Sequence, residues 1–331
     1  MEIILDKSIP FIIFLQNLGT WLTTPMEFFT FLGVEEFYLL IMPVLYWCID
    51  VSMGIRVGVI LLTSGGINTL LKFAFHSPRP YWYSTQIKAL SSETSFGLPS
   101  GHAQNAVSVW GMMAASIQRR WAWIVAILLM FFIGLSRIYL AVHFPTDVLL
   151  GWTVGALLLW AFWVLEPAVK RFFLQFKVTY QVLIVFVLSL ILILSGALIV
   201  QSLSSWELPS LWIQNASQAI PEAEPIDPLS LSGLITNAAA LFGLGAGYIL
   251  LHQQGGFDPR GAWWKRTLRY VLGLIGVIAI WAGLDAVFPD GKTFLAYSLR
   301  YVRYALVGFW MAALAPMVFL RLGLAEKSKE G

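Results

Sequence analysis

Apolar runs of about 20 residues repeat along the chain, and they limit what it can fold into. About ten such segments lie near residues 9–31, 36–50, 55–75, 102–118, 122–142, 147–167, 179–201, 230–252, 268–288 and 301–321. A helix needs about 20 apolar residues to cross a bilayer, where it satisfies its own backbone hydrogen bonds. Only 12% of the 331 residues are charged. The sequence therefore predicts an all-α, polytopic transmembrane helical bundle, an integral membrane protein in contact with membrane lipids.

The first two segments are the least regular. Segment 9–31 carries polar residues at Gln16, Asn17 and Thr20, so it either spans the membrane or lies along the interface. Segment 36–50 is short for a span and crosses only with residues from its flanks.

The positive charges predict which side of the membrane each loop faces. If every segment crosses, fourteen of the 21 Lys and Arg residues fall on one side. Cytoplasmic loops carry the excess of Lys and Arg, so that side is cytoplasmic. The basic residues are scattered among the spans and form no basic run, which argues against a nucleic-acid partner.

A first polar cluster, in "LKFAFHSPRP", lies at the opposite end of segment 55–75. Lys72 and Arg79 are separated by six residues. Pro78 precedes Arg79 and Pro80 follows it, and these two prolines end the helix that carries Lys72. Two cations held by prolines suit an oxyanion with several charges. The alternative is a pair of interfacial cations whose apolar stems lie in the membrane.

A second cluster, in "PSGHAQ", opens segment 102–118. Ser100 is a favourable N-cap, and Gly101 allows close backbone approach at the first turn. The free amides and dipole of a helix N-terminus form an anion site, with His102 at its rim. The alternative is ordinary helix capping with an incidental histidine.

A third cluster, in "SRIYLAVHFPTD", connects segments 122–142 and 147–167. Ser136 and His143 share a helix face, Arg137 lies inside an apolar run, and Asp147 follows Pro145 in the first turn of the next helix. A carboxylate one turn from an imidazole holds one ring nitrogen protonated and leaves the other free to attack. An interfacial histidine with a capping aspartate would not explain the buried Arg137.

All three clusters fall on the same, non-cytoplasmic side. Lys72, Arg79 and Arg137 supply donors for a phosphoryl group, and Ser100 and the Gly101 amide add two more. His143 is the candidate nucleophile and His102 the candidate acid for the leaving oxygen. No carboxylate cluster with metal-ligand spacing accompanies them, so the sequence predicts neither a metal nor another cofactor.

These residues resemble the three signature motifs of the type 2 phosphatidic acid phosphatase (PAP2) superfamily. The motifs are K-x6-R-P from Lys72 to Pro80, P-S-G-H from Pro99 to His102 and S-R-x5-H-x3-D from Ser136 to Asp147. The resemblance covers roughly residues 10–168. It implies a six-helix catalytic core over residues 1–168, followed by about four additional helices over 169–331.

The resemblance also implies a reaction and residue roles. Members hydrolyse a phosphomonoester or diphosphate without a metal, through a covalent phosphohistidine. His143 takes the nucleophile role, Asp147 orients it, and His102 protonates the leaving group. The residues that would cradle the phosphate are Lys72, Arg79, Ser100, Gly101 and Arg137.

Two further stretches, Leu32–Asp50 and Gln104 after "PSGH", are similar to the sphingosine-1-phosphate phosphatase and dolichyl diphosphatase branches. We expect a lipid phosphatase of the plasma or inner membrane, with its active site on the extracytoplasmic side and a lipid phosphate or diphosphate as substrate. The alternatives are a polyprenyl diphosphate phosphatase that recycles a carrier lipid and a carrier that binds lipid phosphates without hydrolysis.

The stretch from Ser202 to Trp212 and the histidine at position 76 receive simpler interpretations. We expect the stretch to be a connecting loop, with an amphipathic lid over the site as the alternative. His76 lies inside the first motif, at a position where members vary, and we expect it to take no part in catalysis.

Overall fold

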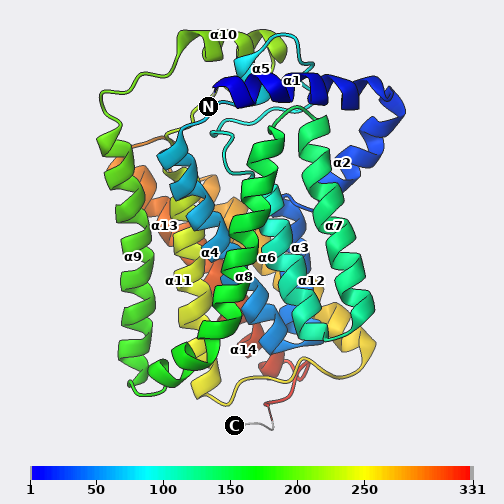
Figure 1. Cartoon of the computed structure of the whole chain (residues 1–331). Coiled ribbons are helices and arrows are strands. Elements are labelled where there is room, and N and C mark those ends of the chain that lie inside the picture. Colours follow the sequence, from blue (N-terminus) through cyan, green and yellow to red (C-terminus); the bar gives the residue numbers. More distant parts are fainter. Residues whose placement is uncertain (1, 329–331) are drawn as a thin grey trace. The chain divides into compact units, whose positions relative to one another are not determined.

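The computed structural model of the chain describes residues 2–328, and those residues form helices without any strand (Figure 1). In chain order the elements are α1 (Glu2–Asn17), η1 (Thr20–Leu22), α2 (Thr23–Phe31), α3 (Glu35–Val44), η2 (Leu45–Ile49), α4 (Val51–Phe75), α5 (Pro80–Tyr83), α6 (Gly101–Ile117), α7 (Arg120–Tyr139), α8 (Pro145–Phe173), α9 (Val178–Ser202), α10 (Ser210–Ala219), α11 (Ser232–Gln253), α12 (Trp263–Asp285), α13 (Phe294–Phe309), η3 (Trp310–Leu314) and α14 (Ala315–Arg321). The all-α class predicted from the sequence is confirmed.

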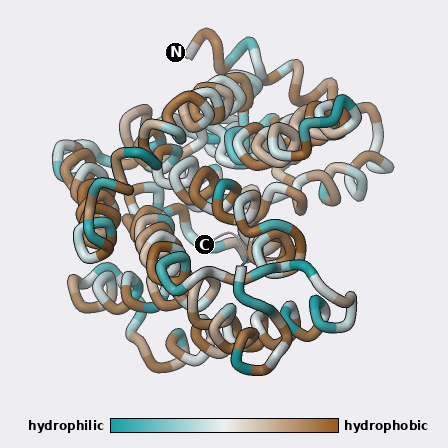
Figure 2. Tube along the Cα trace, turned by 90° about the horizontal axis from the view of Figure 1, so that it is seen from below, coloured by the Kyte–Doolittle hydropathy of each residue, from teal (hydrophilic) through white to brown (hydrophobic). Residues whose placement is uncertain are grey.

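Seven stretches of the described chain are long and apolar enough to cross a membrane. They are Val51–Tyr83, Arg120–Tyr139, Pro145–Phe173, Val178–Ser202, Ser232–Gln253, Trp263–Asp285 and Phe294–Arg321. Figure 2 shows the same pattern, with hydrophobic colour along the helices and hydrophilic colour gathered in the connecting segments. The chain is an integral membrane protein.

The first expected segment, 9–31, is bent rather than straight. The helices Ile3–Asn17 and Thr20–Phe31 are long and apolar enough to cross a membrane only when taken together, and they are bent by 89° relative to each other. Gly19 lies at the bend with a φ of 125°, a conformation that glycine adopts without steric cost. The next expected segment, 36–50, forms a short apolar helix over Phe37–Ile49.

The chain divides into two compact units that are discontinuous in sequence. Unit 1 contains Met1–Phe37, Ile67–Leu159 and Gly196–Ser230, whereas unit 2 contains Tyr38–Gly66, Trp160–Ser195 and Leu231–Gly331. Helices α4, α8 and α9 each begin in one unit and end in the other. All eight residues of the predicted site belong to unit 1.

Close helix contacts in unit 1 fix the start of α6 against the start of α8. A methyl group on Gly151 of α8 would lie 2.6 Å from the carbonyl oxygen of Ser100. A methyl group on Gly155 would lie 2.6 Å from the carbonyl oxygen of Gln104. Small residues four apart allow helix backbones to approach closely in membranes. The two glycines therefore bring the "PSGH" turn beside the residues that follow Pro145.

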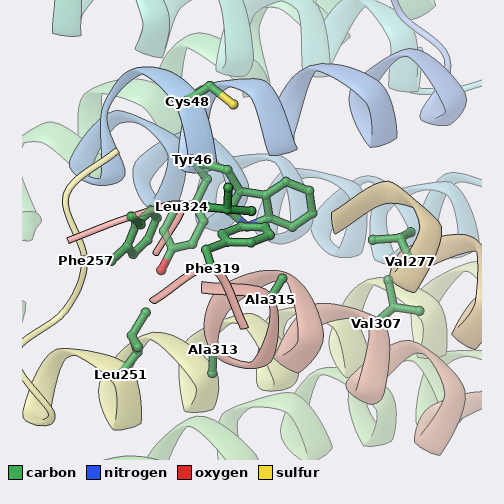
Figure 3. Close-up of a cluster of buried hydrophobic side chains, with 12 residues drawn as sticks. Tyr46, Cys48, Leu251, Phe257, Val277, Val307, Ala313, Ala315, Phe319 and Leu324 are labelled. Atoms are coloured by element: carbon green, nitrogen blue, oxygen red, sulfur yellow. The ribbon is translucent and has the colours of Figure 1, made fainter. Parts of the chain in front are cut away.

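Unit 2 has its own apolar core around the end of α3, shown in Figure 3. Tyr46 and Trp47 are fully buried there, and their rings meet Phe257 and Phe319 edge to face at 5.5 Å. Cys48 is buried in the same cluster. Helices α11 and α13 pack closely in this unit, since a methyl group on Gly243 would lie 2.0 Å from the carbonyl oxygen of Ala305.

Candidate active site

The end of α4 and the turn after it place Lys72 and Arg79. Lys72, in the last turn of α4, donates a hydrogen bond of 2.8 Å to Oγ of Ser95. Arg79 follows the α4 C-terminus, and its guanidinium is completely buried. Pro80 begins α5 directly after it, which fits the preference of proline for the first turn of a helix.

The Arg79 guanidinium binds two segments at once. Its Nε and Nη2 groups donate to Ser95 O at 2.6 Å, Ser95 Oγ at 3.0 Å and Phe96 O at 3.2 Å. Its Nη1 group donates to Val142 O at 2.9 Å and lies 3.3 Å from Nε2 of His143. Arg79 therefore ties the loop before α6 to the turn that carries His143.

Ser100 and Gly101 start α6 as the sequence predicts. Ser100 is the N-cap, and its Oγ accepts a hydrogen bond from the Ala103 amide. The Gln104 amide donates to Ser100 O. A helix leaves its first four amides without intrahelical acceptors, so the amides of Gly101 and His102 remain for a ligand. Gly101 also faces Asn68 of α4, whose Oδ1 would lie 3.1 Å from an added methyl group.

His102 lies in the first turn of α6 against the bend after α2. A methyl group on Gly33 would lie 2.9 Å from Cδ2 of its imidazole, so Gly33 leaves room for the ring. Its Nε2 atom is buried and has no hydrogen-bond partner among the side chains and backbone groups that the structure describes. A buried polar atom without a partner is costly, so it marks a place where a ligand atom would fit.

His143 and Asp147 are buried where α7 passes into α8. Oδ2 of Asp147 lies 3.4 Å from Nδ1 of His143 and accepts a hydrogen bond of 2.9 Å from the Phe144 amide. A guanidinium can only donate, so the Arg79 contact assigns the lone pair to Nε2 and the proton to Nδ1. The Asp147 carboxylate favours the same tautomer, in which Nε2 carries the lone pair.

The electrostatic surroundings of His143 keep its imidazole neutral. Burial holds its pKa well below the ordinary value of 6.5, and the positive charges of Arg79, Arg137 and Lys72 lower it further. A neutral ring is the form that can attack phosphorus.

Arg137 lies in the last turn of α7 and is 2% exposed. Its Nη1 group donates to Oγ1 of Thr30 at 2.9 Å, and its Nη2 group contacts Oε1 of Glu93. Its Nε atom is buried and lacks a hydrogen-bond partner within the described chain. Thus Arg137, like His102, has a buried nitrogen that remains for a ligand.

Glu93 is a site residue that the motif analysis missed. Its carboxylate forms ion pairs with Arg137 and, at 3.7 Å, with Arg79. Burial alone would raise its pKa, but Arg79 and Arg137 hold the pKa well below its ordinary value. A signal was present in the sequence, because Glu93 is the only Asp or Glu between Val51 and Thr146.

The segment after α9 reaches the same loop. Trp206 packs edge to face on His76 and Phe96, with ring centroids 5.5 and 5.7 Å apart. The Asp227 amide donates to Thr94 O at 3.0 Å. The stretch expected to be a connecting loop therefore leads into a helix, α10, which packs against α5 (Figure 1).

The predicted site residues thus converge in unit 1. Arg79 contacts His143, Asp147 contacts His143, and Ser95 joins Lys72 to Arg79. The Ser100 amide donates to Asp147 O at 3.0 Å, which connects the second and third motifs. Among the side chains that the structure describes, there is no group of three or more His, Cys, Asp or Glu residues able to hold a metal ion.

Comparison with known proteins gives matches along most of the chain. The sequence model of the PAP2 superfamily matches residues 54–171, which contain all three motifs. A model described as the transmembrane extension of PAP2 superfamily phosphatases matches residues 235–327. The first match ends close to residue 168, the core boundary expected from the sequence, and that boundary stays a prediction.

Three relatives differ in how much of the chain they match. Glucose-6-phosphatase 3 of Bos taurus is 28% identical over 96% of this chain and 95% of its own length. Phosphatidylglycerophosphatase B of Bacillus subtilis (strain 168) is 30% identical over 46% of this chain and 79% of its own. A probable sphingosine-1-phosphate phosphatase of Dictyostelium discoideum is 30% identical over 45% of this chain and 40% of its own.

Proposed function

Since the chain belongs to the PAP2 superfamily of phosphatases, we propose that it hydrolyses a phosphate ester through a phosphohistidine formed on His143. The reaction needs no metal in this proposal. The observation that carries it is the position of His143 Nε2, which lies 3.3 Å from Nη1 of Arg79 while Nδ1 faces Asp147. A neutral nucleophile oriented by a carboxylate therefore lies beside a cation suited to a phosphoryl group.

In the first step, the Nε2 lone pair of His143 attacks phosphorus in line with the ester oxygen. The N–P bond forms while the P–O bond to the leaving group breaks. His102, protonated once the negatively charged phosphate lies beside it, gives its Nε2 proton to the departing oxygen, so the product leaves as an alcohol, or as a phosphomonoester when the substrate is a diphosphate. Asp147 stabilises the positive charge that develops on the His143 ring.

In the second step, water attacks the phosphohistidine from the side that the alcohol has left. His102, now neutral, accepts a proton from this water and returns to its starting state. The N–P bond breaks, its electron pair returns to His143, and inorganic phosphate is released. The two steps together therefore return the protein to its starting state.

The phosphate oxygens need donors that other groups do not already use. Arg137 Nε and the Gly101 and His102 amides fit this need, and Lys72 and Ser100 supply further donors at the same place. Arg79 donates five hydrogen bonds to its neighbours, so it contributes mainly charge and the position of His143. Such preorganised donors act where charge develops in the transition state.

For the substrate, we propose first a lipid phosphate monoester or diphosphate. The supporting observation is that relatives named phosphatidylglycerophosphatase B and probable sphingosine-1-phosphate phosphatase are each 30% identical to the chain, over 46% and 45% of its length. A polyprenyl diphosphate belongs to the same class of substrates and stays an alternative. In all these cases the tail would enter sideways from the membrane.

A second candidate is a sugar phosphate. Glucose-6-phosphatase 3 of Bos taurus matches 96% of the chain, whereas phosphatidylglycerophosphatase B matches 46% of it. Phosphate release from sphingosine 1-phosphate, phosphatidylglycerophosphate, a polyprenyl diphosphate and glucose 6-phosphate, measured side by side with purified protein, separates the candidates.

The chemistry is tested by trapping the intermediate. With a 32P-labelled substrate that the protein cleaves, a quench in alkaline detergent should leave label on the parent protein, and that label should be stable in base and lost in acid, as expected of a phosphohistidine. His143→Ala should abolish both the label and turnover, whereas His252→Ala, which removes an exposed histidine of unit 2, should preserve both. A His143→Ala protein as active as the parent would overturn the mechanism. Transport of a lipid phosphate without hydrolysis would instead favour a carrier.

For orientation, we propose that the site opens to the extracytoplasmic side of the plasma or inner membrane. The support is the excess of Lys and Arg on the opposite side. Cys48 is the only cysteine and is buried. Labelling of a second, introduced cysteine by a thiol reagent therefore shows which side of the membrane that cysteine faces. A membrane-impermeant maleimide added to intact cells should label Glu224→Cys but not Lys177→Cys. The reverse pattern would overturn the orientation.

A further inference from the structure

Glu93 contacts the phosphate-binding cations without belonging to any of the three motifs. Its carboxylate forms an ion pair with Arg137 and another with Arg79. Both guanidinium groups are buried, at 2% and 0% exposure. Like charges held close together out of water repel each other unless an opposite charge compensates them. Glu93 is the acidic residue that faces both of them.

The backbone of Glu93 is fixed by α5. The hydroxyl of Tyr81 donates to Glu93 O at 3.1 Å and accepts from the Glu93 amide at 2.9 Å. Ser95, two residues later, accepts from both Lys72 and Arg79. Hydrogen bonds at Glu93 and at Ser95 therefore fix the loop that carries the carboxylate, and a fixed carboxylate can orient the guanidinium of Arg137.

The guanidinium of Arg137 has three nitrogen atoms, and two of them donate hydrogen bonds to protein acceptors. Thr30 accepts from Nη1, Glu93 accepts from Nη2, and Nε has no hydrogen-bond partner within the described residues. Two acceptors on the terminal nitrogens fix the plane of the guanidinium. They also restrict the donors available to a ligand to Nε and the remaining Nη protons.

We propose that Glu93 is a positioning residue, which holds Arg137 so that its Nε group donates to the phosphoryl oxygens in the transition state. This role rests on the proposed function, because it requires phosphoryl transfer at His143. Glu93 touches neither phosphorus nor the leaving group, and it acts through Arg137. Because Arg79 and Arg137 keep it ionised, it takes no part in proton transfer.

The first test is Glu93→Gln in the full-length protein, assayed with a phosphomonoester that the parent cleaves. The amide keeps the size and one acceptor but removes the charge that holds Arg137. We expect kcat to fall about 10- to 100-fold, because small displacements of a positioning group have effects of this size, with a smaller change in KM. Glu224→Gln makes the same charge change at an exposed position and should leave kcat unchanged.

Two further measurements separate positioning from a general structural role. The pH profile of kcat in Glu93→Gln should keep both of its limbs, because Glu93 is ionised throughout and neither limb belongs to it. Thr30→Val removes the acceptor at Nη1 and should lower kcat in the same direction. If Glu93→Gln does not fold, Glu93→Asp and Thr30→Val test the proposal in its place. Glu93→Asp keeps the charge but shortens the side chain, and Thr30→Val keeps the shape but removes the acceptor, so each should displace the Arg137 guanidinium.

Three results would overturn the proposal. The first is a Glu93→Gln protein with parental kcat, or parental kcat in both substitute variants if Glu93→Gln does not fold. The second is tighter inhibition by inorganic phosphate with unchanged kcat, which would make Glu93 a competitor for the phosphate site. The third is the loss of one limb of the pH profile, which would make it a proton-transfer group. A fully active His143→Ala protein would instead overturn the proposed function itself.

Discussion

The backbone amide of Ser100 donates a hydrogen bond of 3.0 Å to the carbonyl oxygen of Asp147. This bond joins the N-cap of α6 to the first turn of α8, so the proposed anion site at the helix start is connected to the carboxylate that faces Nδ1 of His143. Gly151 allows this approach, since it lies one turn further along α8 against Ser100 O.

Gly151→Ala should therefore reduce both activity and stability. Its methyl group would lie 2.6 Å from Ser100 O, and the two helices would have to separate. Overpacking of this kind costs about 1–3 kcal/mol, and the shift would displace Ser100 from the phosphate. The measurements are kcat and the thermal midpoint in detergent.

The control for this prediction is Gly233→Ala in α11. An added methyl group there meets no atom within 4 Å, so the thermal midpoint should stay the same or rise slightly. A Gly151→Ala protein with parental kcat and midpoint would show that the α6–α8 approach is not required.

The catalytic motifs were visible in the sequence because local rules place them. Ser100 caps a helix, Pro80 starts one, and Asp147 follows a proline by two residues, so spacing alone predicted where these groups lie. The assignment of His143 and Asp147 to one side of the membrane required only the alternation of spans.

The contacts missing from that prediction depend on distant parts of the chain. Glu93 meets Arg137 from 44 positions away, through a loop whose path no periodicity predicts. Trp206 reaches His76 from beyond α9, and its sequence neighbours resemble an ordinary connection. The sequence did not decide whether segment 9–31 is bent at Gly19, because its polar residues fit both a membrane span and an interfacial helix.

Asp147→Asn should lower kcat about 100-fold or more. The amide group would no longer stabilise the charge that develops on His143, and its NH2 group can turn the ring toward the wrong tautomer. KM should change less, since Asp147 is not among the groups that hold the phosphate. The measurement is steady-state kinetics with the labelled phosphoenzyme as a second readout.

Asp290→Asn, an exposed position of unit 2, provides the charge-matched control. Equal kcat values for Asp147→Asn and the parent would contradict the orienting role.

The pH dependence of activity should show a nucleophile that remains neutral in weak acid. Burial and the charges of Arg79, Arg137 and Lys72 lower the pKa of His143. The acidic limb of kcat/KM that belongs to His143 should therefore lie below pH 6.5, after correction for ionisation of the substrate. An acidic limb of kcat/KM at or above pH 6.5 that persists when each of the other histidines is replaced would contradict this prediction.

The same shift predicts how stability depends on pH. Below pH 6.5 the unfolded chain binds a proton at His143 that the folded protein does not, so the free energy of unfolding falls as pH falls. The slope from this group approaches about 1.4 kcal/mol per pH unit. His143→Gln should reduce the loss of thermal midpoint between pH 6.5 and 5, whereas His252→Ala should not.

Trp206→Ala tests whether the segment after α9 supports the active-site loop. Trp206 contacts the rings of His76 and Phe96, and Phe96 O accepts a hydrogen bond from Arg79. Aromatic pairs contribute about 0.5–1.5 kcal/mol each beyond their burial, so the loop should become more mobile and kcat should fall several-fold. Trp263→Ala, at a position that is 79% exposed on α12, should leave kcat at the parental value. If both variants retain parental kcat, the aromatic contacts of Trp206 do not support the loop, and the residues between α9 and α11 serve only as a connection.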